Sequence, residues 1–523
     1  MRSDTAKLVQ SGLLLTSLFL TACGGGGETA CVPAPAPATT PAPTPAPVIT
    51  SMGTDFFLTL PDHLCVSNPA ICKNTPVTNK LIVAASMATT GEVTFNGVIT
   101  PFSVSAGGQV VITLDPAVVL TTNEVVEAKA IHVTALSPIS VHVVSESSYS
   151  ADGYLALPTA GLGTSYYVMS RASTRYPGSE FAVVATQNNT AVSITPSAAG
   201  ATKPAGVAFT VMLNSGETYQ LANPAYADMT GTLVTADKPV AVFSGHRFAD
   251  VPSGIGYGDY MVEQLPDVSI WGKTHHTALF SGRARYTVRV LASQNGTTIT
   301  TIPAGMIGTM NAGQFVDVDL AGAGEFVSNN PVLVAQFMRG SADDAAGKGD
   351  PSMVMVTPAE LAMTDSTFGV HGLAGTTGAL MNVVTETAAL ATLKLDNAAV
   401  NPALFTPIGG ASIYSAGTLP VAPGAHTLLG SVPYSAIVYD YGIASNAVSY
   451  AYPVASKLSL AASAAPAPAP VTPAPTAANP SPAACVYDHE AEVEQSHEDT
   501  EHDDHDDHDR DDTHHGDGRD AHA

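Results

Sequence analysis

Short runs of β-branched and small apolar residues, separated by turn residues, recur along the central part of the chain. The clearest example covers residues 230–245, where apolar and polar positions alternate over 231–235 and again over 240–244. Alternation with a period of two predicts strands, and Asp237 and Pro239 between the two runs predict a turn. The pattern therefore predicts a β-hairpin with its turn at residues 236–239.

Three further segments repeat this order of strand, X-Pro turn and strand, at residues 130–144, 324–337 and 426–439. A repeat spaced by roughly a hundred residues indicates a fold built from similar units. Each of the first three hairpins is followed by a strand that ends in proline, at residues 153–158, 260–266 and 352–358. One such strand, 55–61, also precedes the first hairpin, whereas no complete one follows the fourth.

A surplus strand at one end and a missing strand at the other predict that the chain closes into a ring. Residues 56–60 would then complete the last sheet beside residues 437–441, and closure would remove exposed sheet edges. We therefore predict an all-β fold, a repeat-built, propeller-like ring of eight short antiparallel sheets. Tandem β-sandwiches of about 100 residues that exchange strands are the alternative. Helices should be nearly absent, apart from one short turn at residues 358–361.

Composition divides the rest of the chain. Of the 523 residues 45% are hydrophobic and only 12% are charged, which suits a secreted all-β protein. We expect the folded domain at residues 53–455, between a Gly- and Pro/Ala-rich linker at 23–52 and an Ala/Pro-rich linker at 456–484. The formal net charge is −25 and no basic residues gather anywhere in the sequence, so a nucleic-acid partner is not expected.

The first 22 residues have the features of a signal peptide. Arg2 and Lys7 precede an apolar run at 13–20 that is too short for an ordinary membrane span. Residues 20–23 read Leu-Thr-Ala-Cys and resemble a bacterial lipobox, which implies cleavage before Cys23, lipidation of its sulfur and attachment to a membrane. Because Gly24 and not Asp follows, we expect the outer membrane, on its periplasmic or cell-surface side.

Four further cysteines lie in what would be an oxidising compartment. Cys65 and Cys72 bracket a loop that contains proline and are predicted to form a local disulfide. Cys31 and Cys485 lie at the outer ends of the two linkers, and a bridge between them would join the ends of the chain. Their spacing does not match a zinc site.

Several segments match one known family, at residues 129–134, 147–159, 161–168, 179–186, 237–245, 251–266, 271–273 and 349–353. In these segments the chain resembles the N-terminal domain of IgG Fc-binding protein and its bacterial relatives. The resemblance implies a non-enzymatic, surface-exposed or secreted domain that binds a protein, and it supplies no catalytic residue. The sequence departs from the family in lacking von Willebrand-type modules and a cysteine pair in residues 245–258.

Tyrosines and carboxylates of the repeats are the candidates for ligand contact. Tyrosine gives a large, rigid contact area with a polar tip, although some of these tyrosines could instead point inward. Asp259 and Glu263 are four residues apart on a predicted strand and so share a face; such a pair suits Ca²⁺, acid–base chemistry or a hydrogen-bonded loop end. The predicted contact residues are Tyr149, Tyr154, Tyr257, Asp259, Tyr260 and Glu263.

A few other residues carry weaker signals. His132 and His142 face each other across the first predicted hairpin, as a metal half-site or as an exposed cross-strand pair. A loop that contains Asp343, Asp344 and Asp350 could hold Ca²⁺, but it lacks the EF-hand spacing. His275 and His276 are expected to cap a loop. Trp271, the single tryptophan, is expected in a core or between modules, not as a platform for a sugar.

The C-terminal tail, 485–523, has the most biased composition. It holds sixteen carboxylates against Arg510 and Arg519, and eight histidines are interspersed among them. Imidazole together with carboxylate suits Zn²⁺ or Ni²⁺, whereas a solvated, disordered polyanion is the plain alternative. The residues predicted to bind metal are His502, His505, His508, His514 and His515.

These observations predict a non-enzymatic surface lipoprotein that binds a host, matrix or envelope protein or glycoprotein. Its second partner would be the membrane, through the lipid anchor. The alternative function is divalent-metal binding outside the cytoplasm by the His/Asp-rich tail.

Overall fold

The computed structural model describes residues 48–460 except 304, 345–346, 377 and 443–447. This part contains thirty strands, one four-residue α-helix, α1 (Leu64–Ser67), and seven short 3₁₀ helices. Among these residues there is no helix with both the length and the apolar character needed to cross a bilayer. The predicted all-β, repeat-built fold is confirmed.

The strands form four antiparallel sheets that follow one another along the chain, and we call these sheets modules 1 to 4. Module 1 contains β1 (Gly53–Leu58), β2 (Thr78–Ala85), β3 (Thr89–Phe95), β4 (Val98–Val104), β5 (Gly108–Thr113), β7 (Ile131–Glu146) and β8 (Ala151–Leu155). Module 2 contains β6 (Val126–Glu127), β9 (Gly163–Tyr167), β10 (Ser179–Ala185), β11 (Thr190–Thr195), β12 (Phe209–Leu213), β13 (Thr218–Ala222), β14 (Leu233–Asp250) and β15 (Gly258–Gln264).

Module 3 contains β16 (Gly272–Thr277), β17 (Tyr286–Ala292), β18 (Thr297–Ile302), β19 (Gly305–Met310), β20 (Phe315–Leu320), β21 (Gly324–Met338) and β22 (Ser352–Met355). Module 4 contains β23 (Met363–Val370), β24 (Leu380–Glu386), β25 (Lys394–Leu395), β26 (Ala398–Ala399), β27 (Phe405–Pro407), β28 (Tyr414–Pro420), β29 (Gly424–Tyr441) and β30 (Ser449–Pro453). The 3₁₀ helices are η1 (Pro69–Cys72), η2 (Pro116–Val118), η3 (Thr159–Gly161), η4 (Val268–Ile270), η5 (Ala359–Leu361), η6 (Thr387–Thr392) and η7 (Pro402–Leu404). The helical turn predicted at residues 358–361 is η5.

Each module is built around one long strand: β7, β14, β21 or β29. These strands are 16, 18, 15 and 18 residues long and run through the X-Pro positions without a turn, so the prediction of four hairpins is wrong. In module 1, Asp55 pairs with Thr134 but Gly53 pairs with Ile139, so one residue of β1 lies between the two pairs where β7 has four. The same offset recurs in the other three modules. The proline lies in this bulge. Its missing backbone N–H group is tolerated there, because the bulged residues form no regular ladder with the neighbouring strand.

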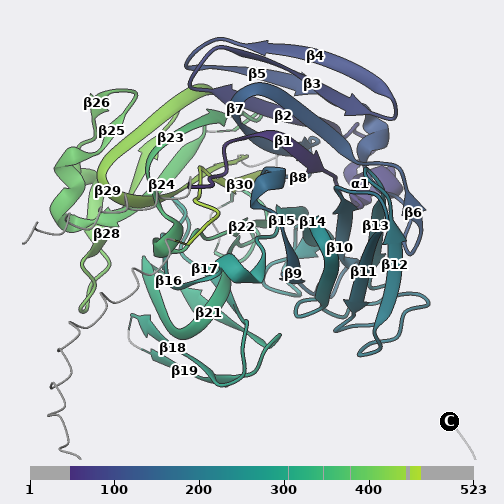
Figure 1. Cartoon of the computed structure of the whole chain (residues 1–523). Helices are drawn as coiled ribbons and strands as arrows, with labels where there is room; N and C mark the ends of the chain where they lie inside the picture. Colours follow the sequence, from purple (N-terminus) through teal and green to yellow (C-terminus); the bar gives the residue numbers. More distant parts are fainter. Residues whose placement is uncertain (1–47, 304, 345–346, 377, 443–447, 461–523) are drawn as a thin grey trace, which may run out of the picture. The chain divides into compact units, whose positions relative to one another are not determined.

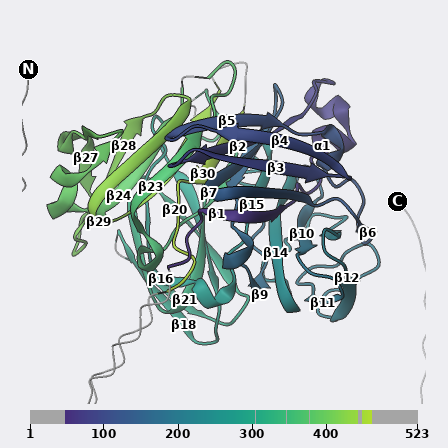
Figure 2. The same ribbon diagram turned by 45° about the horizontal axis from the view of Figure 1, so that its top comes forward.

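The bulge lets one long strand serve two groups of neighbours. The first half of β7 pairs with β1 and β3, and its second half pairs with β2 and β8. The domain therefore has four large sheets, and the prediction of eight short sheets is wrong. Figure 1 shows the four sheets arranged around a central group of strands, and Figure 2 shows the same arrangement from a second direction.

The central group consists of one strand from each module, β8, β15, β22 and β30, which we call the inner strands. β8 packs against β15, β15 against β22, β22 against β30 and β30 against β8, so the circuit is closed. The predicted completion of the last sheet by the N-terminal strand is wrong. Phe56 in β1 pairs with Val133 of its own module, and β30 pairs with residues 437–441. The ends of the domain still meet, because Thr50 bridges to Lys457.

Each module has its own apolar core, and the cores also join neighbouring modules. Trp271 is buried in a cluster that combines residues of modules 2 and 3, among them Val183 and Met355. Its position confirms the expectation of a packing role between modules. A further link is the pairing of Thr218 in β13 with Glu127 in β6, a short strand that module 1 contributes to the sheet of module 2.

Candidate binding site

A buried carboxylate lies where the four inner strands meet. Asp152 in β8 accepts hydrogen bonds from the backbone N–H groups of Val262 in β15 and Met353 in β22, both at 3.2 Å. It also accepts from the Ser352 hydroxyl at 3.1 Å and from the Ala451 N–H of β30 at 3.4 Å. One side chain thus contacts all three other inner strands. Burial raises the pKa of Asp152 well above its ordinary value, against the effect of these hydrogen bonds.

Three more carboxyl groups lie along the line on which the four inner strands meet, which we call the axis. Asp259 and Glu263 of β15 and Asp350, just before β22, are buried, and burial raises the pKa of each well above its ordinary value. Asp350 raises that of Asp259 further. Glu263 accepts a hydrogen bond from the Met355 N–H at 3.1 Å. Burial disfavours the charged form of each of these groups, and the hydrogen bonds of Asp152 and Glu263 end on the other inner strands, so the axis is a structural centre.

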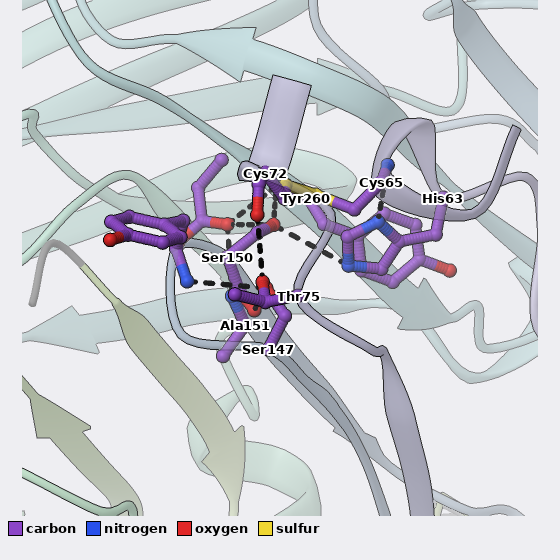
Figure 3. Close-up of a disulfide and its surroundings, with 10 residues drawn as sticks. His63, Cys65, Cys72, Thr75, Ser147, Ser150, Ala151 and Tyr260 are labelled. Atoms are coloured by element: carbon purple, nitrogen blue, oxygen red, sulfur yellow. Dashed lines mark hydrogen bonds between the residues drawn. A yellow bond between two sulfur atoms is a disulfide. The ribbon is translucent and has the colours of Figure 1, made fainter. Parts of the chain in front are cut away.

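A disulfide loop packs against one end of this axis (Figure 3). Cys65 and Cys72 form the predicted disulfide. The His63 ring stacks on Tyr260 at 4.3 Å, and its Nδ1 accepts from the Cys65 N–H at 3.1 Å. Its Nε2 is 3.4 Å from the Ser150 hydroxyl, which in turn donates to Asp259. Burial lowers the pKa of His63 to about 3, so the ring is neutral and connects the loop to the axis.

The connections at this end of the inner strands come from all four modules, and we call the surface of their described residues the loop face. Its described residues are 62–77, 147–150, 171–178, 247–257, 281–285, 339–344, 347–351, 371–376 and 378. All four inner strands begin here. Asp259 at the start of β15 accepts from the Ala151 N–H of β8, and the Asp350 N–H donates to Ser449 at the start of β30.

Contacts between modules join these loops to one another. Arg247 forms an ion pair with Asp62 at 3.1 Å, which links modules 2 and 1. The Gly340 N–H donates to the Val251 carbonyl at 2.8 Å, which links modules 3 and 2. The Gly349 N–H donates to the Gly442 carbonyl, also at 2.8 Å, and links modules 3 and 4. Between modules 4 and 1 the surface has a depression of about 240 Å³, lined by Pro76, Thr78, Glu146, Ser147, Ser148, Leu373, Ala374 and Val448.

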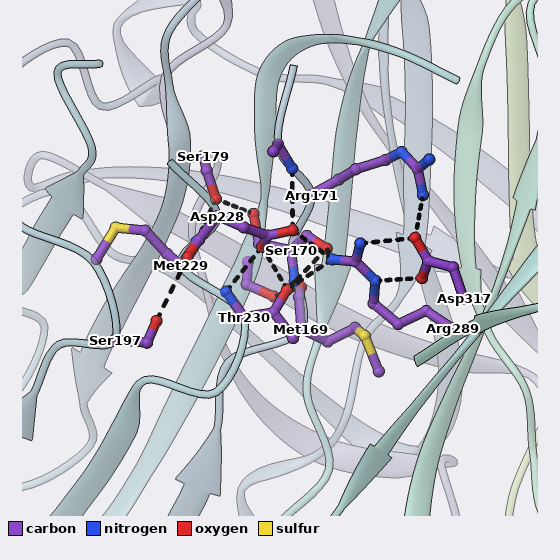
Figure 4. Close-up of polar contacts among 12 residues, drawn as sticks. Met169, Ser170, Arg171, Ser179, Ser197, Asp228, Met229, Thr230, Arg289 and Asp317 are labelled. Carbon is purple, nitrogen blue, oxygen red and sulfur yellow. Dashed lines mark hydrogen bonds and ion pairs between the residues drawn. The ribbon is translucent and has the colours of Figure 1, made fainter. Parts of the chain in front are cut away.

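A buried ion network holds modules 2 and 3 together below the loop face (Figure 4). The Arg289 guanidinium of β17 pairs with Asp317 at 2.7 Å and with Asp228 at 2.6 Å. It also donates to the Ser170 carbonyl at 2.7 Å. Because Asp228 and Ser170 belong to module 2, the arginine fixes the orientation of one module against the next. The network therefore joins modules 2 and 3 beside the loop-face segment 171–178, which follows Ser170.

Two of the six predicted contact residues lie on the loop face at its surface. Tyr257 is 57% exposed and has a φ of 70°, a left-handed conformation that bulky residues rarely adopt. Tyr149 is half-buried, and its ring lies 4.4 Å from the Lys73 ammonium group. Tyr154, Asp259, Tyr260 and Glu263 are buried inside the ring, and a partner at the surface would not contact them. Their role in binding stays a prediction.

The other singled-out residues have structural partners. His132 and His142 do not face each other, because both lie on β7: His132 pairs with Asp55 at 2.6 Å, and His142 is buried 3.2 Å from the Pro453 carbonyl. His275 and His276 lie within β16 and do not cap a loop. Asp343 and Asp344 pair with Arg285 and Arg283, each at 2.9 Å. The described residues contain no group of three or more His, Cys, Asp or Glu placed to hold a metal ion.

Several predictions concern residues outside the part of the chain that the structure describes. They are the lipidated Cys23, the Cys31–Cys485 bridge and the tail histidines His502, His505, His508, His514 and His515. The residues that organise the ring, Asp152 above all, are not among the predicted site residues. A polar residue between apolar neighbours in a strand that precedes Leu-Pro is the signal that could have indicated it.

Comparison with protein families identifies the type of domain. The model of the family described as IgGFc binding protein matches residues 152–439, which is more than half of the chain. The chain belongs to this family. The match begins at Asp152 on the first inner strand and ends in β29, so it spans most of the ring.

One sequence relative agrees with the family. The human IgGFc-binding protein is 28% identical over 275 residues, which is 51% of this chain but only 5% of that protein. Membership in this family fits a module that binds a protein partner. Two solved structures of bacterial ice-binding adhesins align with TM-scores of 0.12 and 0.11, at 10% and 13% identity. They cover 60% and 77% of this chain and 98% of each adhesin chain. These scores are too low to relate the folds.

Proposed function

We propose that the folded region is a non-enzymatic adhesion module that holds an extracellular protein or glycoprotein on its loop face. The observation that carries the proposal is the convergence of loops from all four modules on one rigid surface, in a chain of the IgGFc binding protein family. Binding residues are commonly presented by loops on a rigid scaffold. The human relative's name gives IgG Fc as the first partner to test.

The position of the chain ends supports display at a cell surface. The Leu458 N–H donates to the Ile49 carbonyl at 2.7 Å, so the two ends of the described domain leave side by side. Leu458 packs with Leu157 and Leu361, which follow the last residues of inner strands. The ends are therefore opposite the loop face. A lipid on Cys23 would tether the module to the outer membrane with the loop face directed away from it.

Binding to arrays of serum proteins, matrix proteins and glycans tests this function. The purified chain from Gly24 onward is applied with and without Ca²⁺, and IgG Fc is included among the proteins. We expect a captured protein to be lost with Tyr149→Ala/Tyr257→Ala. Met212→Ala is the control, because Met212 is 56% exposed and lies in β12, outside the loop face. Capture of no protein, or equal loss in the control, would contradict the proposal.

The tail supports a second candidate, divalent-metal binding. His502, His505 and His508 are spaced by three residues between aspartates, a donor set that suits Zn²⁺ or Ni²⁺. Calorimetric titration with Zn²⁺ of the full chain and of a chain that ends at residue 484 separates the two functions. We expect heat of binding only from the full chain, whereas array binding should be unchanged by the deletion.

A further inference from the structure

The loop face differs in charge from the chain that carries it. The chain has a formal net charge of −25, yet none of the exposed residues in the described loops of this face is Asp or Glu. Lys73, Arg175 and Arg285 are exposed there, and Lys348 and Arg247 are half-buried. The basic residues that the sequence scatters along the chain are thus brought together by the fold.

The carboxylates of the same loops are withdrawn from the surface. The side chains of Asp62, Asp343 and Asp344 are 3%, 4% and 1% exposed, and they pair with arginines. Asp250 and Asp350 are buried as well. In the depression between modules 4 and 1, Glu146 is 19% exposed and pairs with Lys80 and His371. Over the other loops a partner that approaches this surface meets the cations first, and the carboxylates behind them orient the guanidinium groups.

Three of the cations lack a carboxylate partner within the described residues. Lys73 contacts the Tyr149 hydroxyl at 3.3 Å and its ring at 4.4 Å. Lys348 lies 5.4 Å from the centre of the Tyr441 ring. Arg175 is exposed beside Tyr176, which packs edge-on against Phe248 at 5.1 Å. Tyrosine and arginine are the residues that contribute most at protein–protein interfaces, so the face combines apolar anchors with unpaired positive charge.

We infer that the loop face recognises an acidic surface of a partner protein. The inference rests on the proposed function and adds the chemistry of the partner. Charge complementarity selects a negative surface and speeds its association, and the tyrosines supply contact area that a purely electrostatic encounter lacks. An anionic glycan shares the charge of such a partner but would not need the tyrosines.

The test uses the purified chain from Gly24 onward and a charge-reversed variant, Lys73→Glu/Arg175→Glu/Lys348→Glu. The matched control, Lys203→Glu/Lys273→Glu/Lys394→Glu, changes the net charge by the same amount at surface positions outside the loop face. Binding to a poly-glutamate peptide, a poly-glutamine peptide and heparin is measured by surface plasmon resonance at low and high salt. The proteins captured on the array are tested in the same way.

We expect binding to poly-glutamate but not to poly-glutamine, weakened about tenfold or more by the loop-face reversal and by salt, and little changed by the control. Tyr257→Ala should weaken binding to a captured protein while leaving heparin unaffected. Tighter binding to heparin than to any protein, or equal loss in both charge variants, would overturn the inference. If binding of a captured protein is unchanged by the charge reversal but is lost with the substitutions of Tyr149 and Tyr257, the proposed function stands and the inference of an acidic partner is contradicted.

Discussion

Asp152 shows how one residue can join units that are far apart in the sequence. Its carboxylate accepts hydrogen bonds from backbone or hydroxyl groups of three other inner strands, and it is fully buried. Backbone N–H groups at the centre of the ring have no water to bond with, so loss of this acceptor leaves several donors unsatisfied.

We therefore expect Asp152→Asn to destabilise the domain by roughly 1–3 kcal/mol, because the amide replaces one acceptor oxygen by a donor that faces other donors. Chemical unfolding followed by circular dichroism measures the change. Asp365→Asn, at an exposed position, is the control and should have almost no effect. Equal stability of the Asp152 and Asp365 variants would show that the central carboxylate has no structural role.

At the same scale, the sequence identified residue types better than their environments. The tyrosines and carboxylates of the inner strands stood out in the sequence, but Tyr154 and Tyr260 are fully buried. Alternation of apolar and polar residues distinguishes the two faces of a strand only when one face is exposed to solvent. The inner strands are covered on both faces by neighbouring modules, and that burial depends on contacts between residues about a hundred or more positions apart, as between Asp152 and Val262.

At the scale of the element, the X-Pro positions were found correctly but interpreted as turns. Proline together with Asp or Ser predicts a turn, and a bulge produces the same local composition. The difference lies in the neighbouring strand, since one of its residues opposes four of the long strand in every module. The sequence of the long strand alone does not show how the neighbouring strand pairs with it, and so it does not distinguish a bulge from a turn.

Two substitutions in β21 separate the bulge from the regular strand. Pro331→Ala should cost only roughly 0.4–1 kcal/mol, because it adds freedom to the unfolded chain and removes no hydrogen bond. Val334→Pro should prevent folding or cost about 3 kcal/mol or more, because Val334 is paired with Val290 in the ladder. Thermal unfolding of both variants measures the contrast. Similar losses for the two positions would mean that residue 331 is not in a tolerant bulge.

At the scale of the whole molecule, the closed ring was predicted from the wrong strand. Residues 449–453 form the inner strand of module 4, but they read Ser-Tyr-Ala-Tyr-Pro and were not included with the proline-terminated strands of the other modules. The shared feature is a proline after a short apolar run, preceded by leucine in modules 1 and 2, by threonine in module 3 and by tyrosine in module 4. Counting this strand restores four equal units, and β1 then pairs within module 1.

The buried titratable groups of the ring should make stability depend on pH from both sides. Burial lowers the pKa of His63, His246 and His275 to about 3 and that of His142 to about 4. Below about pH 6.5 these histidines bind protons in the unfolded chain but not in the folded chain. The free energy of unfolding therefore falls on acidification by up to about 1.4 kcal/mol per histidine and pH unit.

The raised pKa of buried Glu263 acts in the opposite direction. Its contribution is complete below about pH 4 and is lost as the pH rises through the folded value, because the folded state keeps the proton to a higher pH than the unfolded chain does. Denaturant unfolding between pH 4 and 8, at about one-unit intervals, measures both effects. We expect His142→Gln to flatten the acid side and Glu263→Gln to flatten the alkaline side. Parallel curves for wild type and variants would contradict these assignments.

At the closure of the ring between modules 1 and 4, a side-chain amide forms the pair of hydrogen bonds that a neighbouring strand would otherwise make with the backbone of one residue. Gln109 in β5 donates to the Val370 carbonyl and accepts from the Val370 N–H, both at 3.2 Å. Gln109→Glu keeps the acceptor but places a second oxygen against the carbonyl, which should cost roughly 1–2 kcal/mol. Gln187→Glu makes the same chemical change at an exposed position.

Hydrogen exchange locates that loss within the molecule. If the Gln109 pairing closes the ring, the substitution should increase exchange mainly at the edges where β2 and β23 pack together, while the interface between modules 2 and 3 keeps its protection through Arg289. Uniform loss of protection would mean that the four modules open as one unit. An unchanged pattern would mean that the inner strands alone hold modules 1 and 4 together.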